Sequence, residues 1–106
     1  MTYNTRLKEQ SFLVYGLGLS GQSVVKFFKK NSFKNFQVWD DKQKKKFRSY
    51  RAQNLKKTLN KVNYIVLSPG ISLLKNKILK KFRKKIITDL DLFFKTISPP
   101  SFNFIV

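Results

Sequence analysis

The stretch SFLVYGLGLSG, residues 11–21, joins a short apolar run to three closely spaced glycines. The run SFLVY is rich in β-forming residues, which predicts a buried strand. After the last glycine, Val24, Val25, Phe27 and Phe28 recur at helical spacing, which predicts an amphipathic helix that ends near Asn31. A strand therefore passes through a glycine-rich turn directly into a helix.

The rest of the chain repeats this alternation. Short apolar runs predict strands at residues 35–39, 63–67, 85–88 and 102–106, and helices are expected over 73–83 and from Asp89 onward. Residues 43–59 are dominated by Lys, Arg and Gln, so we expect a mobile basic connection there, with a short strand near 49–53 and a helical turn from Asn54. Strands that alternate with helices predict an α/β protein, a Rossmann-like doubly wound parallel sheet of about five strands in a single domain, residues 1–106.

The composition excludes several classes of chemistry. The chain has no Cys and no His, which excludes disulfide scaffolds, Cys/His zinc sites, a Cys nucleophile and a Ser-His-Asp triad. No apolar run approaches the roughly 20 residues of a membrane-spanning helix, and residues 1–10 are too polar for a signal peptide. We therefore expect a cytoplasmic protein without a membrane partner.

The charge is strongly positive, with 23 Lys and Arg against 5 Asp and Glu, for a net charge of +18. One interpretation is a basic module that binds nucleic acid. The other is compositional bias, because 19 of the 23 cations are Lys and an AT-rich genome encodes Lys, Asn, Ile and Phe often. Both interpretations predict non-specific attraction to polyanions at low salt.

The glycine pattern Gly16-x-Gly18-x-x-Gly21 predicts an anion site at the start of the helix. The first glycine permits a tight turn, the second lets backbone N–H groups approach a phosphate, and the third lets the helix pack close to the strand. Leu19 and Ser20 would offer backbone amides, and the Ser20 hydroxyl would cap the helix or bind a phosphate oxygen. The alternative is an ordinary turn between a strand and a helix.

Two further segments are candidates for contact with a ligand. Asp40 ends the second strand 22 residues after Gly18, where dinucleotide-binding domains place a ribose-binding acid, so an NAD(H)-binding domain is an alternative. Residues 68–71, Ser-Pro-Gly-Ile, follow the third strand and would face the same crevice, although Pro and Gly also form plain turns. Asp89 and Asp91 are interpreted as the start of a helix, where they complement its dipole, and no catalytic residue or metal ligand is predicted.

Three segments together resemble the N-terminal domain of the Mur ligases. VYGLGLSG at residues 14–21 is similar to the glycine turn of that family, VLSPGI at 66–71 to its Ser-Pro-Gly turn, and TDLDLF at 88–93 to the start of a later helix. Their order and spacing fit the family, and the resemblance covers nearly the whole chain except residues 42–59. Within this family, the sequence most resembles the ligases that add D-glutamate to UDP-N-acetylmuramoyl-L-alanine in peptidoglycan precursor synthesis.

The resemblance implies that this domain holds the UDP part of that substrate. Leu19 and Ser20, with the three glycines, would contact the diphosphate, and Asp40, Asp41 and Lys42 would lie beside the uracil. Ser68 and Gly70 would line the same cleft. Two residues differ from the family pattern: Asp41 occupies a position where the family usually has Ser or Thr, and Asp91 occupies a position where it has Glu.

In the family, a strand like residues 102–106 leads directly into the ATP-binding loop of a central domain. Since this chain has no such loop, we expect the ATP site, the Mg²⁺ ligands and the amino-acid-binding C-terminal domain to lie beyond residue 106. The resemblance thus implies an N-terminal piece of a ligase, which binds no cofactor and does not catalyse alone.

Overall fold

Four parallel strands form one sheet in the computed structural model, which describes residues 5–96. They are β1 (Phe12–Tyr15), β2 (Phe36–Trp39), β3 (Tyr64–Leu67) and β4 (Ile86–Ile87), in the spatial order β2-β1-β3-β4. Phe12 lies opposite Phe36 on one side and Tyr64 on the other. The predicted α/β fold with a parallel sheet is confirmed, whereas the strand expected at 102–106 lies outside the described residues.

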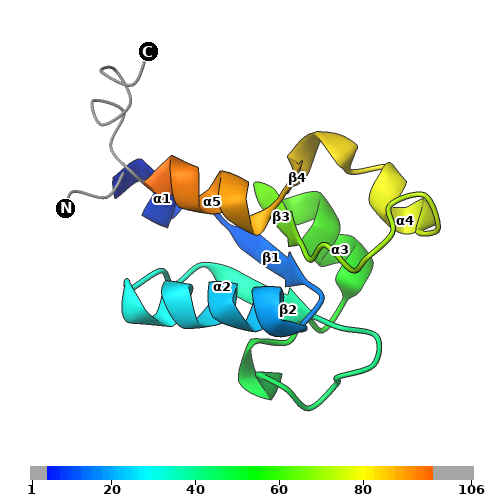
Figure 1. Ribbon diagram of the computed structural model, residues 1–106, viewed down its shortest axis with the longest axis horizontal. Coiled ribbons are helices and arrows are strands. Elements are labelled where there is room, and N and C mark those ends of the chain that lie inside the picture. Colours follow the sequence, from blue (N-terminus) through cyan, green and yellow to red (C-terminus); the bar gives the residue numbers. More distant parts are fainter. Residues whose placement is uncertain (1–4, 97–106) are drawn as a thin grey trace.

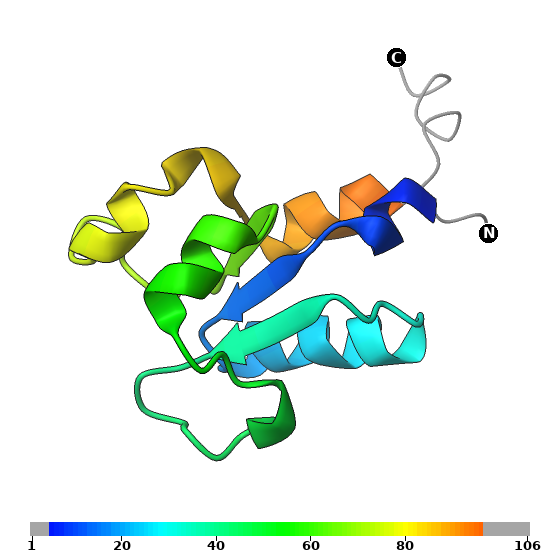
Figure 2. The same ribbon diagram turned by 180° about the vertical axis from the view of Figure 1, so that it is seen from behind.

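Helices cover both faces of this sheet (Figures 1 and 2). One face carries α1 (Thr5–Glu9), α2 (Leu19–Lys30) and α5 (Asp89–Thr96), and the other carries α3 (Leu55–Lys61) and α4 (Lys77–Lys80). Successive side chains of β1 point to opposite faces, so Phe12 and Val14 pack under α2 while Leu13 and Tyr15 pack under α3 and α4. Because both faces of β1 are covered, the strand is apolar throughout, as the sequence predicted.

Phenylalanine dominates the core beneath α2. The rings of Phe12 and Phe28 lie 4.9 Å apart between centroids, and those of Phe28 and Phe33 lie 5.0 Å apart. Both Phe12 and Phe28 are fully buried. This packing fixes α2 on the sheet and thereby fixes its first turn beside the ends of the strands.

The helix predicted over 73–83 is wrong in extent. The structure has only α4, followed by a short 3-10 helix, η2 (Arg83–Lys85). The side chain of Asn76 accepts the backbone N–H of Leu79 at 3.0 Å, so the helix begins after Asn76. Leu74 therefore precedes the helix and is 80% exposed, and it does not extend an apolar stripe.

The basic connection also differs from expectation in part. Residues 48–50 form a 3-10 helix, η1 (Arg48–Tyr50), and the only strand-like contact there among the described residues is an isolated bridge between Val38 and Arg51. The helical turn expected from Asn54 is confirmed: its side chain accepts the N–H of Lys57 at 3.0 Å and begins α3. The short helix α1 was not predicted.

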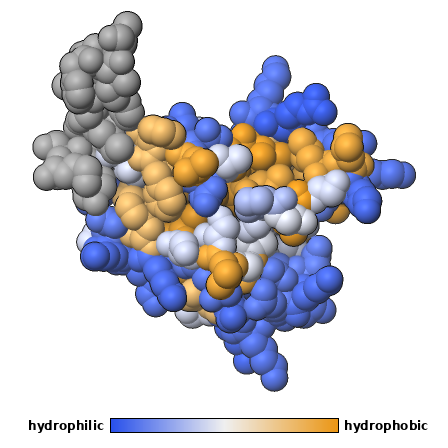
Figure 3. Space-filling view, viewed as in Figure 1, coloured by the Kyte–Doolittle hydropathy of each residue, from blue (hydrophilic) through white to orange (hydrophobic). Residues whose placement is uncertain are grey.

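Several large apolar side chains remain exposed. Figure 3 shows hydrophobic residues over α5 and over the region of β4 and α4, with hydrophilic side chains at the rim. Leu90 and Phe94 of α5 are 64% and 60% exposed. No helix in the described part of the chain is both long and apolar enough to cross a membrane.

Candidate functional site

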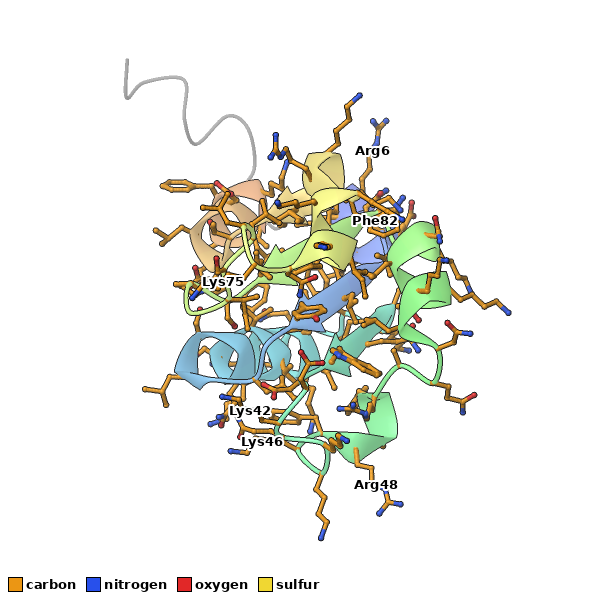
Figure 4. All side chains as sticks on the ribbon, turned by 90° about the vertical axis from the view of Figure 1, so that its right-hand side faces the viewer. Arg6, Lys42, Lys46, Arg48, Lys75 and Phe82 are labelled. Atoms are coloured by element: carbon orange, nitrogen blue, oxygen red, sulfur yellow. The ribbon has the colours of Figure 1, made fainter. Side chains whose placement is uncertain are left out.

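The candidate site is a cavity of about 420 Å³ at the carboxyl ends of β1, β2 and β3. The turns that follow these three strands line it. Nine of the ten residues predicted to contact a ligand lie on its wall, and they are Gly16, Gly18, Leu19, Ser20, Asp40, Asp41, Lys42, Ser68 and Gly70. Figure 4 labels Lys42 on the loop after β2 and Lys75 on the loop after β3.

The tenth residue, Gly21, lies behind the wall and packs the helix onto the turn. A Cβ atom there would lie 1.9 Å from the carbonyl oxygen of Gly16, so only glycine allows α2 this close to β1. Gly16 itself has φ +100°, in the region that favours glycine, and its N–H donates to the carbonyl of Trp39 at 2.7 Å. The roles predicted for the first and third glycines are therefore confirmed.

Gly18 differs from the other two because a Cβ atom at this position would have no neighbour within 4 Å. It occupies the N-cap position of α2, and no side chain caps this helix end. The backbone N–H groups of the first helical turn have no partner within the helix. The turn thus presents unobstructed backbone donors beside the cavity.

Ser68 braces the glycine turn from the end of β3. Its hydroxyl donates to the carbonyl of Gly16 at 2.9 Å, and its N–H donates to the carbonyl of Tyr15 at 3.2 Å. Because its hydroxyl proton is used in this way, Ser68 shapes the wall of the cavity and does not donate into it.

Asp40 organises the loop after β2. One carboxylate oxygen accepts the N–H of Leu17 at 2.7 Å, and the other accepts the N–H groups of Lys42 and Gln43, both at 2.8 Å. Partial burial raises the pKa of Asp40, but the three backbone donors and the Arg51 charge outweigh it, so this pKa lies below its ordinary value. The carboxylate is therefore ionised at neutral pH and holds two turns together.

Asp41 is held at the mouth of the cavity by a tryptophan. The indole N–H of Trp39 donates to one carboxylate oxygen of Asp41 at 2.9 Å. The guanidinium of Arg51 lies 4.0 Å from the centre of the Trp39 ring and donates to the carbonyl of Asp40 at 3.0 Å. This arrangement of Arg51, Trp39 and Asp41 could not be predicted from spacing, because Arg51 comes from the basic connection.

Leu19 and Ser20 begin α2 at the edge of the cavity. Leu19 is 88% exposed. The Ser20 hydroxyl donates to a carboxylate oxygen of Asp89 at 2.8 Å, so it neither caps the helix nor stays open to a ligand in this structure. Asp89 begins α5 as predicted, but its contact with Ser20, 69 residues away, was not expected.

Pro69 and Ile71, which belong to the segment 68–71 expected at this crevice, also line the cavity, whereas sequence reasoning missed Tyr15 and Gln43. Tyr15 is the last residue of β1, and its phenolic oxygen accepts a hydrogen bond from the Asn76 amide at 3.2 Å. Burial raises the pKa of Tyr15 above its ordinary value, the bond from Asn76 opposes this, and the charges of Asp41 and Asp40 add to it. The position of Tyr15 directly before the glycine turn was the signal that could have identified it.

The charges on the wall are few and mixed. Asp40 and Asp41 are the acidic residues that line the cavity, and Lys42 is the cation. An anionic ligand would thus be held chiefly by backbone N–H groups and the positive end of the α2 dipole. The large positive charge of the chain is not concentrated on this wall.

Comparison with known proteins identifies the family of this chain. Residues 10–88 match the family model described as Mur ligase MurD-like, N-terminal domain. The matched segment contains all ten of the predicted contact residues. A search of curated proteins finds no match to this chain. Since the family match extends over most of its length, the chain belongs to the family of MurD-like N-terminal domains of Mur ligases.

Proposed function

We propose that this domain binds the UDP part of UDP-N-acetylmuramoyl-L-alanine, as the N-terminal part of a ligase that adds D-glutamate to this peptidoglycan precursor. One observation carries the proposal. Nine of the ten residues predicted to contact UDP come from three turns that are far apart in the sequence, and these nine line a single cavity at the carboxyl edge of the sheet. That edge is where ligands bind in open α/β sheets.

In this proposal the diphosphate lies against the first turn of α2. The amides of Leu19 and Ser20 donate to its oxygens, and the missing side chain of Gly18 leaves room for their approach. Lys42 supplies the cation on the wall. The fixed backbone donors need no rearrangement, which favours binding because little conformational entropy is lost.

The uracil lies beside the loop after β2. Asp41 has one oxygen engaged by Trp39, and its other oxygen remains as an acceptor for a ligand N–H. Asp40 acts indirectly, since it fixes the backbone of Lys42 and Gln43. Ser68 and Gly70 close the opposite wall.

An NAD(H)-binding domain is the weaker candidate. In that alternative Asp40 would accept hydrogen bonds from a ribose. Three backbone N–H groups already occupy its carboxylate, which offers about four lone-pair sites in all. The one lone-pair site that remains on Asp40 could accept from at most one of the two hydroxyls of a ribose.

Catalysis in this proposal belongs to the other domains of the ligase. ATP and Mg²⁺ would activate the substrate there, while the present domain anchors the nucleotide end. The isolated chain is accordingly expected to bind substrate without forming an amide bond.

Calorimetric titration tests the proposal. The 106-residue protein at about 0.15 M salt is titrated with UDP-N-acetylmuramoyl-L-alanine and, separately, with NAD. Trp39 is the only tryptophan and touches the wall, so its fluorescence gives an independent signal. Selective binding of the UDP compound that weakens in Lys42→Gln but not in Lys30→Gln supports the proposal. Equal or tighter binding of NAD would refute it.

A further inference from the structure

The positive charge is distributed unevenly along the chain. Residues 42–88 hold 16 of the 23 cations and no acidic residue. This stretch builds η1, α3, α4 and η2, and so it covers the β2 edge and one face of the sheet. The acidic residues lie elsewhere: Glu9, Asp40, Asp41, Asp89 and Asp91.

Three cavities lie on this acid-free part of the molecule. The largest, about 530 Å³, lies between η1 and α3, and its cations are Arg51, Lys57 and Lys61. A second, about 230 Å³, lies between α3 and α4 and is lined by Lys56, Lys77 and Lys81 together with Ile78 and Phe82. The third, about 410 Å³, is lined by residues 80–85. We call the residues that line these cavities the basic surface.

The three cavities are adjacent: the first two lie beside α3, and the second and third share lining residues. Lys56 and Lys57 are consecutive on this helix and line different cavities, while Lys81 and Phe82 are shared by the second and third. Figure 4 shows α3 between the segment with Arg48 and the segment with Phe82. No residue of the basic surface lines the proposed UDP cavity.

Aromatic rings are part of these walls. Tyr50 lines the first cavity, stacks on Phe36 with 4.6 Å between ring centroids, and has the ammonium of Lys29 5.7 Å from its ring centre. Phe82 lines the other two, is half-buried, and has the ammonium of Lys85 5.5 Å from its ring centre. Rings beside a cationic groove are the combination with which proteins hold single-stranded nucleic acids, the phosphates on the cations and the bases on the rings.

Two cations of the basic surface form hydrogen bonds within the protein. Lys85 donates to the carbonyls of Leu59 and Asn60 at the end of α3, and Arg51 donates to the carbonyl of Asp40. By contrast, Lys57, Lys61 and Lys81 are exposed on the cavity rims. The predominance of Lys over Arg favours contacts with phosphates over the reading of bases.

We propose that the basic surface binds single-stranded nucleic acid without sequence preference, at a site separate from the UDP cavity. Phosphates would lie along Lys57, Lys61 and Lys81, and bases would stack on Phe82. The proposal goes beyond the ligase function and does not depend on it.

The test compares two variants with equal loss of charge. One is the triple variant Lys57→Gln, Lys61→Gln, Lys81→Gln on the basic surface, and the other is Lys26→Gln, Lys30→Gln, Lys34→Gln, whose lysines are also exposed and lie on α2 or shortly after it. Circular dichroism confirms that both fold. Binding of a fluorescein-labelled oligothymidine of about 12 nucleotides is measured by anisotropy at several salt concentrations.

The first variant should bind about tenfold more weakly at roughly 0.15 M salt, and the slope of log K against log salt should decrease by up to about 2. The second should stay near the parent protein in both quantities. Equal losses in the two variants would overturn the proposal, because they would leave only general polyelectrolyte attraction.

Phe82→Leu separates stacking from charge. It should weaken oligothymidine binding about fivefold or more while binding of heparin, which has charge but no bases, stays unchanged. An unchanged oligothymidine affinity in this variant, or tighter binding to duplex DNA or to vesicles containing phosphatidylserine, would overturn the proposal. Saturating UDP-N-acetylmuramoyl-L-alanine should not displace the oligonucleotide, so the outcome is independent of the ligase function.

Discussion

The carboxylate of Asp40 accepts the backbone N–H of Leu17 at 2.7 Å and thereby joins the loop after β2 to the glycine turn after β1. These two turns form adjacent walls of the candidate cavity. The second oxygen of the same carboxylate holds the backbone at Lys42 and Gln43. Asp40 therefore shapes the cavity from within the wall.

Replacing Asp40 by Asn should destabilise the fold. The amide retains one acceptor oxygen but turns an NH₂ group toward a backbone donor, and it loses the charge that strengthens these hydrogen bonds. We expect the free energy of unfolding to decrease by about 1–3 kcal/mol, measured by urea denaturation. Asp41→Asn is the control, because Asp41 is exposed and its remaining carbonyl oxygen still accepts from Trp39. If Asp41→Asn lowered the free energy of unfolding as much as Asp40→Asn does, the structural role of Asp40 would be contradicted.

Stability should decrease in acid because of the same carboxylate. The pKa of Asp40 is lowered in the folded protein, and the pKa of Asp91 is lowered by hydrogen bonds from Thr88. A group with a lowered folded pKa stabilises the fold above its unfolded pKa, about 3.9 for Asp, and this contribution is lost as the pH falls through the folded value. The Tm should therefore be steady near pH 6 and fall below about pH 4. The double variant Asp40→Asn, Asp91→Asn should show a shallower acid decline, and an equally steep one would argue against these two residues.

Gly21→Ala and Gly18→Ala should separate packing from binding. Alanine is intrinsically favoured over glycine in a helix by about 1 kcal/mol. At Gly21, however, the new Cβ would meet the Gly16 carbonyl oxygen at 1.9 Å, so we expect a net loss of about 1–3 kcal/mol in urea denaturation. At Gly18 the Cβ meets nothing within 4 Å, so stability should be retained while affinity for the UDP compound falls. Destabilisation by Gly18→Ala equal to that by Gly21→Ala would contradict this division.

Local patterns in the sequence predicted the frame of this molecule well. The strand, glycine turn and helix of residues 11–30 obey rules of short range, and burial of both faces of β1 left an apolar run that is easy to recognise. The three turns of the candidate site were predicted together because parallel strands end at one edge. Such inferences need only the order of elements.

What sequence reasoning missed depends on contacts at long range or on competition between weak signals. Ser20 meets Asp89 across 69 residues, and no spacing rule predicts this pair. In 73–83 the apolar spacing indicated a long helix, but the cap at Asn76 begins α4 at Lys77 and the chain passes into η2 soon after Lys80, which leaves Leu74 exposed before the helix. The strand expected near 49–53 was replaced by η1, with Phe47 preceding it at φ 52°.

The pair Ser20 and Asp89 leads to the last prediction, an effect of charge on ligand binding. Asp89 places a negative charge next to a residue that lines the proposed diphosphate site, so it should oppose an anionic ligand. Asp89→Asn keeps an acceptor oxygen for the Ser20 hydroxyl and removes the charge. By Coulomb's law at intermediate dielectric, the affinity for UDP-N-acetylmuramoyl-L-alanine should rise roughly twofold to tenfold.

Asp91→Asn is the matched control: it lies in the same helical turn, but its carboxylate bonds to Thr88 and not to Ser20. Titration calorimetry of both variants at two salt concentrations checks the prediction, since a charge effect shrinks as salt screens it. If both variants gained affinity equally, the effect would come from net charge, and the position of Asp89 beside Ser20 would have no part in it.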